Sequence, residues 1–248
     1  MPVAQIKVDF LEKELIEKKA KMLMLGYQKK SSETFPVDPE AILWDYLNPE
    51  EGVWLDNECD LGIDKETREP ILGMTIPQKK EIKIDASLKN QEGRYRFTLA
   101  HEIGHWVLHS SLLLVPKGQR TFFNNEIVEF LSLNHNIFPK ASHSKLPPEE
   151  WQANRFAAYL LIDADILSRE FIKRFGKEPH DYRVLKEKCE IDNHFCSMRE
   201  YSRDIAKTAV MGLQSLADLF VVSVEAMAIR IEEVGMIYES PKYSLFSL

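Results

Sequence analysis

Three residues within five positions of the chain have side chains that could bind a metal ion and use it. His101, Glu102 and His105 form an H-E-x-x-H motif. An α-helix turns once in about 3.6 residues, so the two histidines lie one turn apart on one face, where both imidazoles can reach a single Zn²⁺. Glu102 lies beside that face, where a general base for a zinc-bound water belongs. The motif therefore predicts a hydrolytic zinc centre.

The residues around the motif favour a buried helix. They are mostly apolar: Phe97, Leu99, Ala100, Ile103, Trp106, Val107 and Leu108. Burying a polar or ionisable group without a partner costs about 2–7 kcal/mol. The alternative is a core helix that carries two histidines by chance. A metal ion is the simplest partner for the three polar side chains, so we favour the metal site.

A catalytic zinc needs a third protein ligand and an open fourth position. His109 follows His105 by one turn on the same helix. Three consecutive turns of a straight helix cannot converge on one ion. We therefore expect His109 to cap the helix or to contact a ligand from behind.

A second predicted helix, over residues 147–161, offers better candidates for the third ligand. It starts with two prolines followed by Glu149 and Glu150, as a helix N-terminus should. Asn154 lies one turn after Glu150, and its carbonyl could accept a hydrogen bond from the second ring nitrogen of a ligand histidine. This favours Glu150 over Glu149, although either could be a solvated residue that stabilises the helix dipole.

Three blocks of the chain are distinctive when they are taken in order. Residues 97–109 read FTLAHEIGHWVLH, residues 150–161 read EWQANRFAAYLL, and residues 216–237 read LADLFVVSVEAMAIRIEEVGMI. Together they resemble the ImmA/IrrE family of gluzincin-like zinc metallopeptidases, with the third block similar to its C-terminal signature. The resemblance implies His101, His105 and Glu150 as zinc ligands and Glu102 as the catalytic base. It also implies one specific cut in a protein substrate, a helix-turn-helix repressor of the XRE type, which would release genes of a mobile element or a stress response.

Two stretches depart from the family's pattern. Ile162 and Asp163 stand where the family usually has a proline, so the second helix could end differently. Residues 110–146 form a long insertion between the two ligand helices. Its apolar patches, interrupted by Gly118 and Pro139, predict an added helix and a loop. Such an insertion could cover the active site, shape a substrate groove or do neither.

The elements before the H-E-x-x-H helix predict a small sheet. An amphipathic helix is expected over residues 5–26 and a short helix over 37–46. Extended segments follow around 52–55, 71–76 and 81–85, separated by prolines and charged turns. We expect a mixed or antiparallel sheet, and the clean alternation of Glu81–Asp85 makes this segment our candidate for an edge strand to which a substrate adds its backbone.

The C-terminal part of the sequence is expected to contain helices. Two are expected over 166–175 and 182–190, and residues 213–234 resemble a helix-turn-helix, with Ala217, Met227 and Ile231 facing inward and a turn at Val222 and Ser223. Its second helix carries three glutamates against Arg230 alone, and the chain has a net charge of −7. A DNA-binding protein needs cations for the phosphates. We therefore expect a helical subdomain that supports the catalytic domain or docks a protein substrate, and no direct DNA contact.

Composition is that of a globular intracellular protein. The 248 residues are 44% hydrophobic and 29% charged, and the three cysteines have no framework spacing, which favours a reducing cytoplasm. No segment has the pattern of a signal peptide or a membrane span. We expect an α+β protein with a mostly helical metallopeptidase domain over 1–205 and a helix-turn-helix-like segment over 206–248. The oligomeric state is not indicated.

Several chemical points stay open at this stage. Two imidazoles and one carboxylate also suit Mn²⁺ or Fe²⁺. The group that stabilises the oxyanion of the reaction could be His109, Tyr159, His135, His143 or a C-terminal tyrosine. The alternative function is a non-catalytic antirepressor that binds a regulator and uses the metal structurally. An intact Glu102 argues against it, because a structural metal site has no use for a base beside its ligands.

Overall fold

The computed structural model describes residues 8–30, 35–112, 129–133, 146–176, 180–181 and 210–238. The chain divides into two compact units, Met1–Leu161 and Ile162–Leu248. The domain boundary predicted at 205/206 lies outside the described residues. Among these residues, no helix combines the length and the apolar composition that spanning a bilayer requires.

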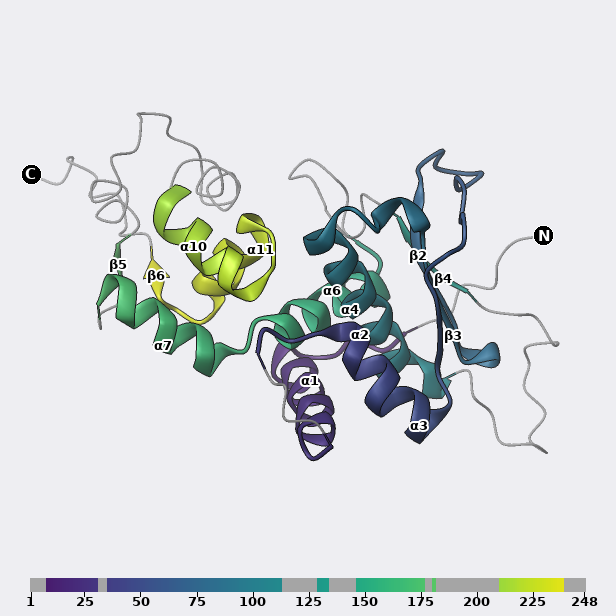
Figure 1. Cartoon of the computed structure of the whole chain (residues 1–248), viewed down its shortest axis with the longest axis horizontal. Helices are drawn as coiled ribbons and strands as arrows, with labels where there is room; N and C mark the ends of the chain where they lie inside the picture. The colour runs from purple at the N-terminus through teal and green to yellow at the C-terminus, as the bar shows by residue number, and fades with distance from the viewer. Residues whose placement is uncertain are drawn as a thin grey trace, which may run out of the picture. The chain divides into compact units, whose positions relative to one another are not determined.

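A four-stranded sheet forms one layer of the first unit (Figure 1). Its strands are β1 (Trp54–Asp56), β2 (Ile71–Ile76), β3 (Glu81–Ile84) and β4 (Phe130–Leu133), in the order β1-β3-β2-β4. The β1 strand pairs parallel with β3, whereas β2 pairs antiparallel with both β3 and β4. The prediction of an α+β fold with mostly helices and a small mixed sheet is confirmed.

The prediction that Glu81–Asp85 forms a sheet edge is wrong. The β3 strand lies between β1 and β2. Its side chains alternate between buried Ile82 and Ile84 and half-buried Glu81 and Lys83. Such alternation shows that one face of a strand is buried, but it carries no information on whether a second strand pairs with its open side.

The edge strand nearest the H-E-x-x-H helix comes instead from the predicted insertion. Within residues 110–146 we expected a helix and a loop, but Phe130–Leu133 form β4, which pairs with β2. The sheet is therefore completed by a strand that follows the helix in sequence. A short apolar run reads equally well as a helix segment or a buried strand, and only its pairing with β2 decides between them.

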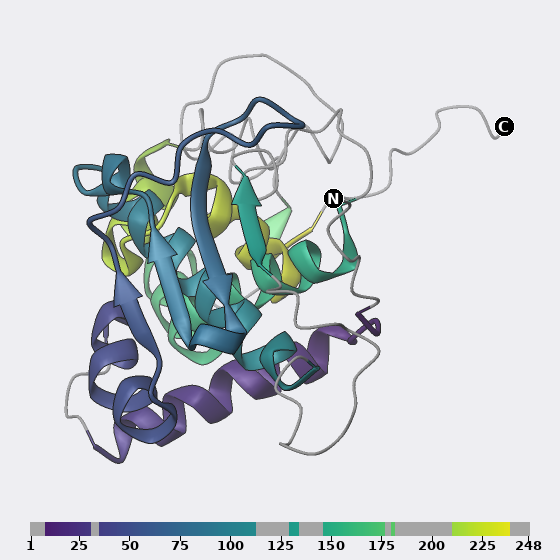
Figure 2. The same ribbon diagram turned by 90° about the vertical axis from the view of Figure 1, so that its right-hand side faces the viewer.

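Helices cover one face of the sheet (Figure 2). The H-E-x-x-H motif lies on α4 (Glu92–His109), which packs against α6 (Pro148–Leu161), and α6 in turn contacts α1 (Lys13–Gln28). A shorter helical stretch consists of α2 (Pro39–Ile42), a π-helical turn (Leu43–Leu47) and α3 (Asn48–Glu51).

The first helix begins later than the sequence predicts, at Lys13 rather than residue 5. Residues 8–12 are not helical. Tertiary contacts hold this segment: the Asp9 carbonyl accepts a hydrogen bond from Gln152, and Phe10 stacks on Trp151 with ring centroids 5.5 Å apart. Contacts with α6 therefore outweigh the local preference for a helix.

Gly104 allows α4 and α6 to approach closely. A Cβ atom at this position would lie 3.2 Å from the Cα atom and from the carbonyl oxygen of Ala153, and 3.2 Å from the Cβ of Phe156. Two of these three atoms belong to the backbone of α6, so they move only if the helix moves. Gly104 lies between the two histidines of the motif, so the same approach brings α6 to their face of α4.

We expect Gly104→Ala to destabilise the protein by about 1 kcal/mol. Overpacking costs about 1–3 kcal/mol, and the better helix propensity of alanine returns up to about 1 kcal/mol. The matched control is Gly93→Ala on the same helix, where an added Cβ meets nothing within 4 Å. Urea unfolding measures both variants. A Gly104→Ala variant as stable as Gly93→Ala would contradict the close approach of the helices.

The second unit begins where α6 ends. Asp163 caps α7 (Ala164–Phe175) by accepting hydrogen bonds from the amides of Asp165 and Ile166, so the second predicted helix ends here and a capping aspartate separates it from the next helix. The unit also contains a two-residue parallel pair, β5 (His180–Asp181) and β6 (Ile237–Tyr238). The helix predicted over 182–190 lies outside the described residues.

Two helices, α10 (Val210–Phe220) and α11 (Val224–Glu233), occupy the segment that resembles a helix-turn-helix. Ala217, Met227 and Ile231 are fully buried. The Ser223 side chain caps α11 by accepting from the amide of Ala226 at 3.1 Å. Val221, where such a motif favours glycine, has a φ of +54°, which is the left-handed region. The helix-turn-helix interpretation itself stays a prediction.

Candidate metal centre

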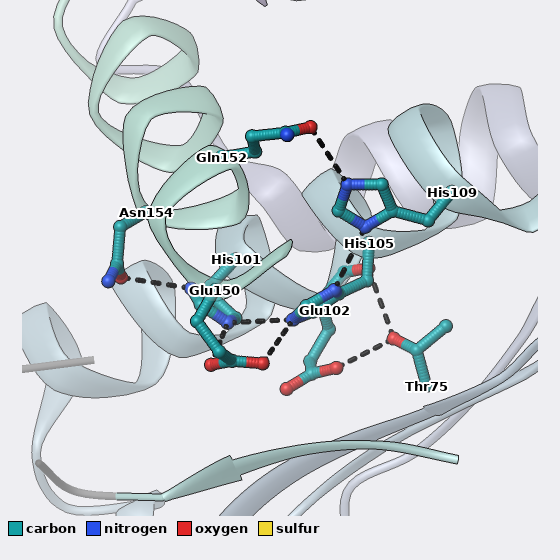
Figure 3. A network of polar contacts seen from close by, with 8 residues as sticks. All are labelled: Thr75, His101, Glu102, His105, His109, Glu150, Gln152 and Asn154. Atoms are coloured by element: carbon teal, nitrogen blue, oxygen red, sulfur yellow. Dashed lines mark hydrogen bonds and ion pairs between the residues drawn. The ribbon is translucent and has the colours of Figure 1, made fainter. Parts of the chain in front are cut away.

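Three buried side chains from two helices converge at one point (Figure 3). His101 and His105 lie one turn apart on α4, and Glu150 lies in the first turn of α6. The two Nε2 atoms are 3.0 Å apart. The Glu150 carboxylate oxygens lie 3.4 Å from Nε2 of His101 and 3.2 Å from Nε2 of His105. These residues form a possible metal site among the described residues.

The separations fit a small divalent cation. Ligand atoms about 2.0–2.1 Å from a tetrahedral zinc ion lie about 3.3 Å from one another, close to the distances observed. Oε2 of Glu150 is buried and makes no hydrogen bond within the described part of the chain. A buried carboxylate that faces two ring nitrogens, with one oxygen unsatisfied, forms with them a ligand set that a cation would complete.

The charges of the three groups are coupled. Burial opposes ionisation of Glu150, but the two imidazoles outweigh it and hold the pKa of this carboxyl well below its usual range. Burial also disfavours a charged His101, but the nearby Glu150 carboxylate outweighs it and raises the His101 pKa. The site therefore keeps an ionised carboxylate ready to balance positive charge.

Asn154 lies directly behind His101. Its Oδ1 is 3.0 Å from Nδ1 of the imidazole, so in neutral His101 the Nδ1–H donates to the amide oxygen and the Nε2 lone pair faces Glu150. This lone pair and the carboxylate repel one another, and a cation between them removes the repulsion. The structure thus brings Asn154 to the position that we predicted for an outer partner of a ligand.

His109 lies behind His105 rather than in the site. Its Nδ1 is 3.2 Å from Nδ1 of His105, and its Nε2 is 3.2 Å from Oε1 of Gln152. Burial, reinforced by the charge of His105, lowers the pKa of His109 to about 3. Both ring nitrogens are therefore engaged, which leaves neither to stabilise an oxyanion. His135 and His143, two other candidates for that role, lie outside the described residues.

The sheet holds Glu102 through β2. The Thr75 hydroxyl donates a hydrogen bond of 2.6 Å to Oε2 of Glu102 and lies 3.1 Å from the Glu102 backbone carbonyl (Figure 3). Oε1 is buried and has no hydrogen-bond partner among the described residues. Burial raises the pKa of this carboxyl, and the two histidines oppose the shift. One oxygen is thus fixed and the other is left open.

Gly73 provides the space for that open oxygen. A Cβ atom at Gly73 would lie 2.4 Å from Oε1 of Glu102 and 2.9 Å from its carboxyl carbon. Our sequence reasoning missed both Gly73 and Thr75. A signal was present, because an isolated glycine in the strand ILGMTI indicates that another group approaches the backbone closely.

The β4 strand completes the surroundings of the motif. Phe130 pairs with Thr75 and Ser132 pairs with Gly73, so both project from the face of the sheet that meets α4. The Phe130 ring stacks on His105 with centroids 4.7 Å apart and an interplanar angle of 16°. The Ser132 hydroxyl lowers the pKa of Glu102, although no hydrogen bond of good geometry joins the two groups.

Two histidines on one helix, a glutamate from a second helix and a buried glutamate beside them are the residue types that metallopeptidases use as ligands and base. Residues 69–232, more than half of the chain, match the peptidase M78 family, described as an IrrE N-terminal-like domain. The chain belongs to this family, which confirms the resemblance drawn from the sequence blocks and points to a peptidase. A search of curated proteins gave no match.

Proposed function

We propose that the protein is a zinc-dependent endopeptidase that makes a specific cut in a protein substrate. The observation that carries the proposal is the open oxygen of Glu102. This oxygen is buried, has no partner among the described residues and belongs to the motif whose two histidines converge with Glu150. A purely structural metal site would not need an unpartnered carboxylate next to its ligands, because burying one is costly.

The chain's own side chains would divide the chemistry as follows. His101, His105 and Glu150 would hold the ion, for which Mn²⁺ and Fe²⁺ are the alternatives to Zn²⁺. When bound, zinc supplies Lewis acidity, which lowers the pKa of water towards neutrality and polarises the scissile carbonyl. Glu102 would take the proton from the attacking water at Oε1 and return it to the leaving amine, while Thr75 keeps Oε2 in place.

We propose that an extended substrate segment adds to the outer edge of β4. This is the end strand of the described sheet, and its Phe130 ring stacks on His105 while its Ser132 hydroxyl lowers the pKa of Glu102. Pairing by β-strand addition supplies backbone hydrogen bonds. These bonds would hold a peptide at a fixed distance from the candidate metal centre. It would replace the role that we assigned to β3.

The proposed substrate is a helix-turn-helix repressor of the XRE type, cleaved in the cytoplasm to derepress genes of a mobile element or a stress response. This proposal depends on the family membership of the chain. We assign α10 and α11 a supporting or docking role for the protein substrate rather than a role in DNA binding. The net charge of −7 favours that choice.

The test is zinc content by elemental analysis, together with cleavage of repressors encoded in neighbouring genes. We expect close to one zinc ion per wild-type chain and a single cut. His105→Ala and Glu150→Ala should lose both the zinc and the cleavage. Glu149→Ala is the matched control, because it removes the neighbouring acid and should keep both. Zinc retained in Glu150→Ala would refute the third ligand, and a wild type without metal would favour the antirepressor.

A further inference from the structure

A line of polar contacts runs from the back of His105 to the N-terminal segment. Nδ1 of His105 lies 3.2 Å from Nδ1 of His109, and Nε2 of His109 lies 3.2 Å from Oε1 of Gln152. The amide nitrogen of Gln152 then donates to the backbone carbonyl of Asp9 at 2.9 Å. His105, His109 and Gln152 are all fully buried, so water does not replace these partners. Figure 3 shows His105, His109 and Gln152 linked in succession by dashed lines.

The far end of this line fixes the direction of every hydrogen bond. The Asp9 carbonyl can only accept, so Gln152 must turn its NH₂ group towards Asp9 and its oxygen towards His109. An amide oxygen can only accept, so the hydrogen of His109 lies on Nε2 and its Nδ1 holds a lone pair.

That lone pair sets the form of His105. Nδ1 of His105 must donate to Nδ1 of His109, because two lone pairs at 3.2 Å would repel one another. Nε2 of His105 then holds a lone pair towards His101 and Glu150, which is the form that a metal ligand needs, and a cation bound between the two Nε2 atoms removes the repulsion of their lone pairs. In the other tautomer, His105 would present an N–H group to the site and could not bind a cation.

We propose that Gln152 is a positioning residue for the metal centre and that it sets the tautomer of His105 through His109. Asn154 performs the same task for His101 in a single step. The two ligand histidines are thus controlled by separate residues of α6. The inference rests on the metal centre of the proposed function, but not on peptidase activity.

The test compares Gln152→Met with Asn154→Leu in the full chain labelled with ¹⁵N-histidine. Long-range ¹H–¹⁵N spectra of the metal-free protein above neutral pH report the tautomer of each imidazole. We expect Gln152→Met to change the forms of His105 and His109 and to leave His101 as it is. Asn154→Leu should change His101 alone. Competition with a chromophoric zinc chelator should show affinity about 10- to 100-fold weaker in each variant.

Two results would overturn the proposal. One is a Gln152→Met variant in which His105 keeps its hydrogen on Nδ1 and zinc affinity changes less than about twofold. The other is a change of all three rings in both variants, which would indicate a general loosening of the site. A wild type that binds no zinc would refute the metal centre, whereas its imidazole spectra would still show whether Gln152 sets the tautomer.

Discussion

Replacement of Glu102 by glutamine is expected to leave the metal bound and to lower the rate of peptide hydrolysis by about 10²- to 10⁴-fold. Glutamine has nearly the same shape and keeps an oxygen that can accept the hydrogen bond from Thr75. It cannot take a proton from the attacking water. Since His101, His105 and Glu150 are unchanged, zinc content should stay close to that of the wild type.

The stability of this variant separates the reaction from the fold. Burial raises the pKa of the Glu102 carboxyl, so the folded protein gains nothing from ionising it. We therefore expect metal-free Glu102→Gln to have a melting temperature at least as high as that of the metal-free wild type. The decisive comparison is repressor release in cells beside cleavage in vitro. Full cellular activity in a metal-loaded Glu102→Gln protein would show that the protein acts by binding, as an antirepressor does.

The second large effect is expected from Gly73→Ala, which adds one methyl group beneath Glu102. The new Cβ would lie 2.4 Å from Oε1 and 2.9 Å from the carboxyl carbon, so the side chain of Glu102 must move. Its carboxylate is the end of a flexible side chain and yields more easily than the strand. A displacement of about 1 Å at a reacting group can cost about 10²-fold in rate. We expect such a loss in kcat with unchanged zinc content.

A double-mutant cycle shows whether Gly73 acts through Glu102. Added to Glu102→Gln, the alanine should cost little further activity, because the group that it displaces no longer transfers a proton. Gly93→Ala is the control, because nothing lies within 4 Å of its added Cβ and it should cleave like the wild type. Independent, multiplying losses in the double variant would refute the role of Gly73.

Local sequence patterns predict the part of the site that lies on single helices. The spacing of His101 and His105 places them on one face of α4, and the one-turn spacing of Glu150 and Asn154 places both on one face of α6. Helix periodicity and end signals are sufficient for these positions. The small mixed sheet follows from short extended segments between turn residues.

Long-range pairing explains what the sequence does not predict. The pairing of β3 with β1, the strand at Phe130–Leu133 and the non-helical segment around Asp9 depend on partners distant in the sequence. The same holds for Thr75 and Gly73, whose roles depend on α4 lying across β2. The role of Gln152 is not predicted either. It follows Glu150 by two positions, and residues with this spacing on a helix face different directions.

The origin of β4 changes how the region between the ligand helices can be engineered. A truncation of residues 110–146 would remove more than a surface segment, because it takes away an outer strand and the phenyl ring that stacks on His105. An inactive truncation would therefore say nothing about access of substrate. Two shorter excisions, one within 113–128 and one within 134–145, retain Phe130–Leu133 and separate support of the catalytic centre from control of entry to it.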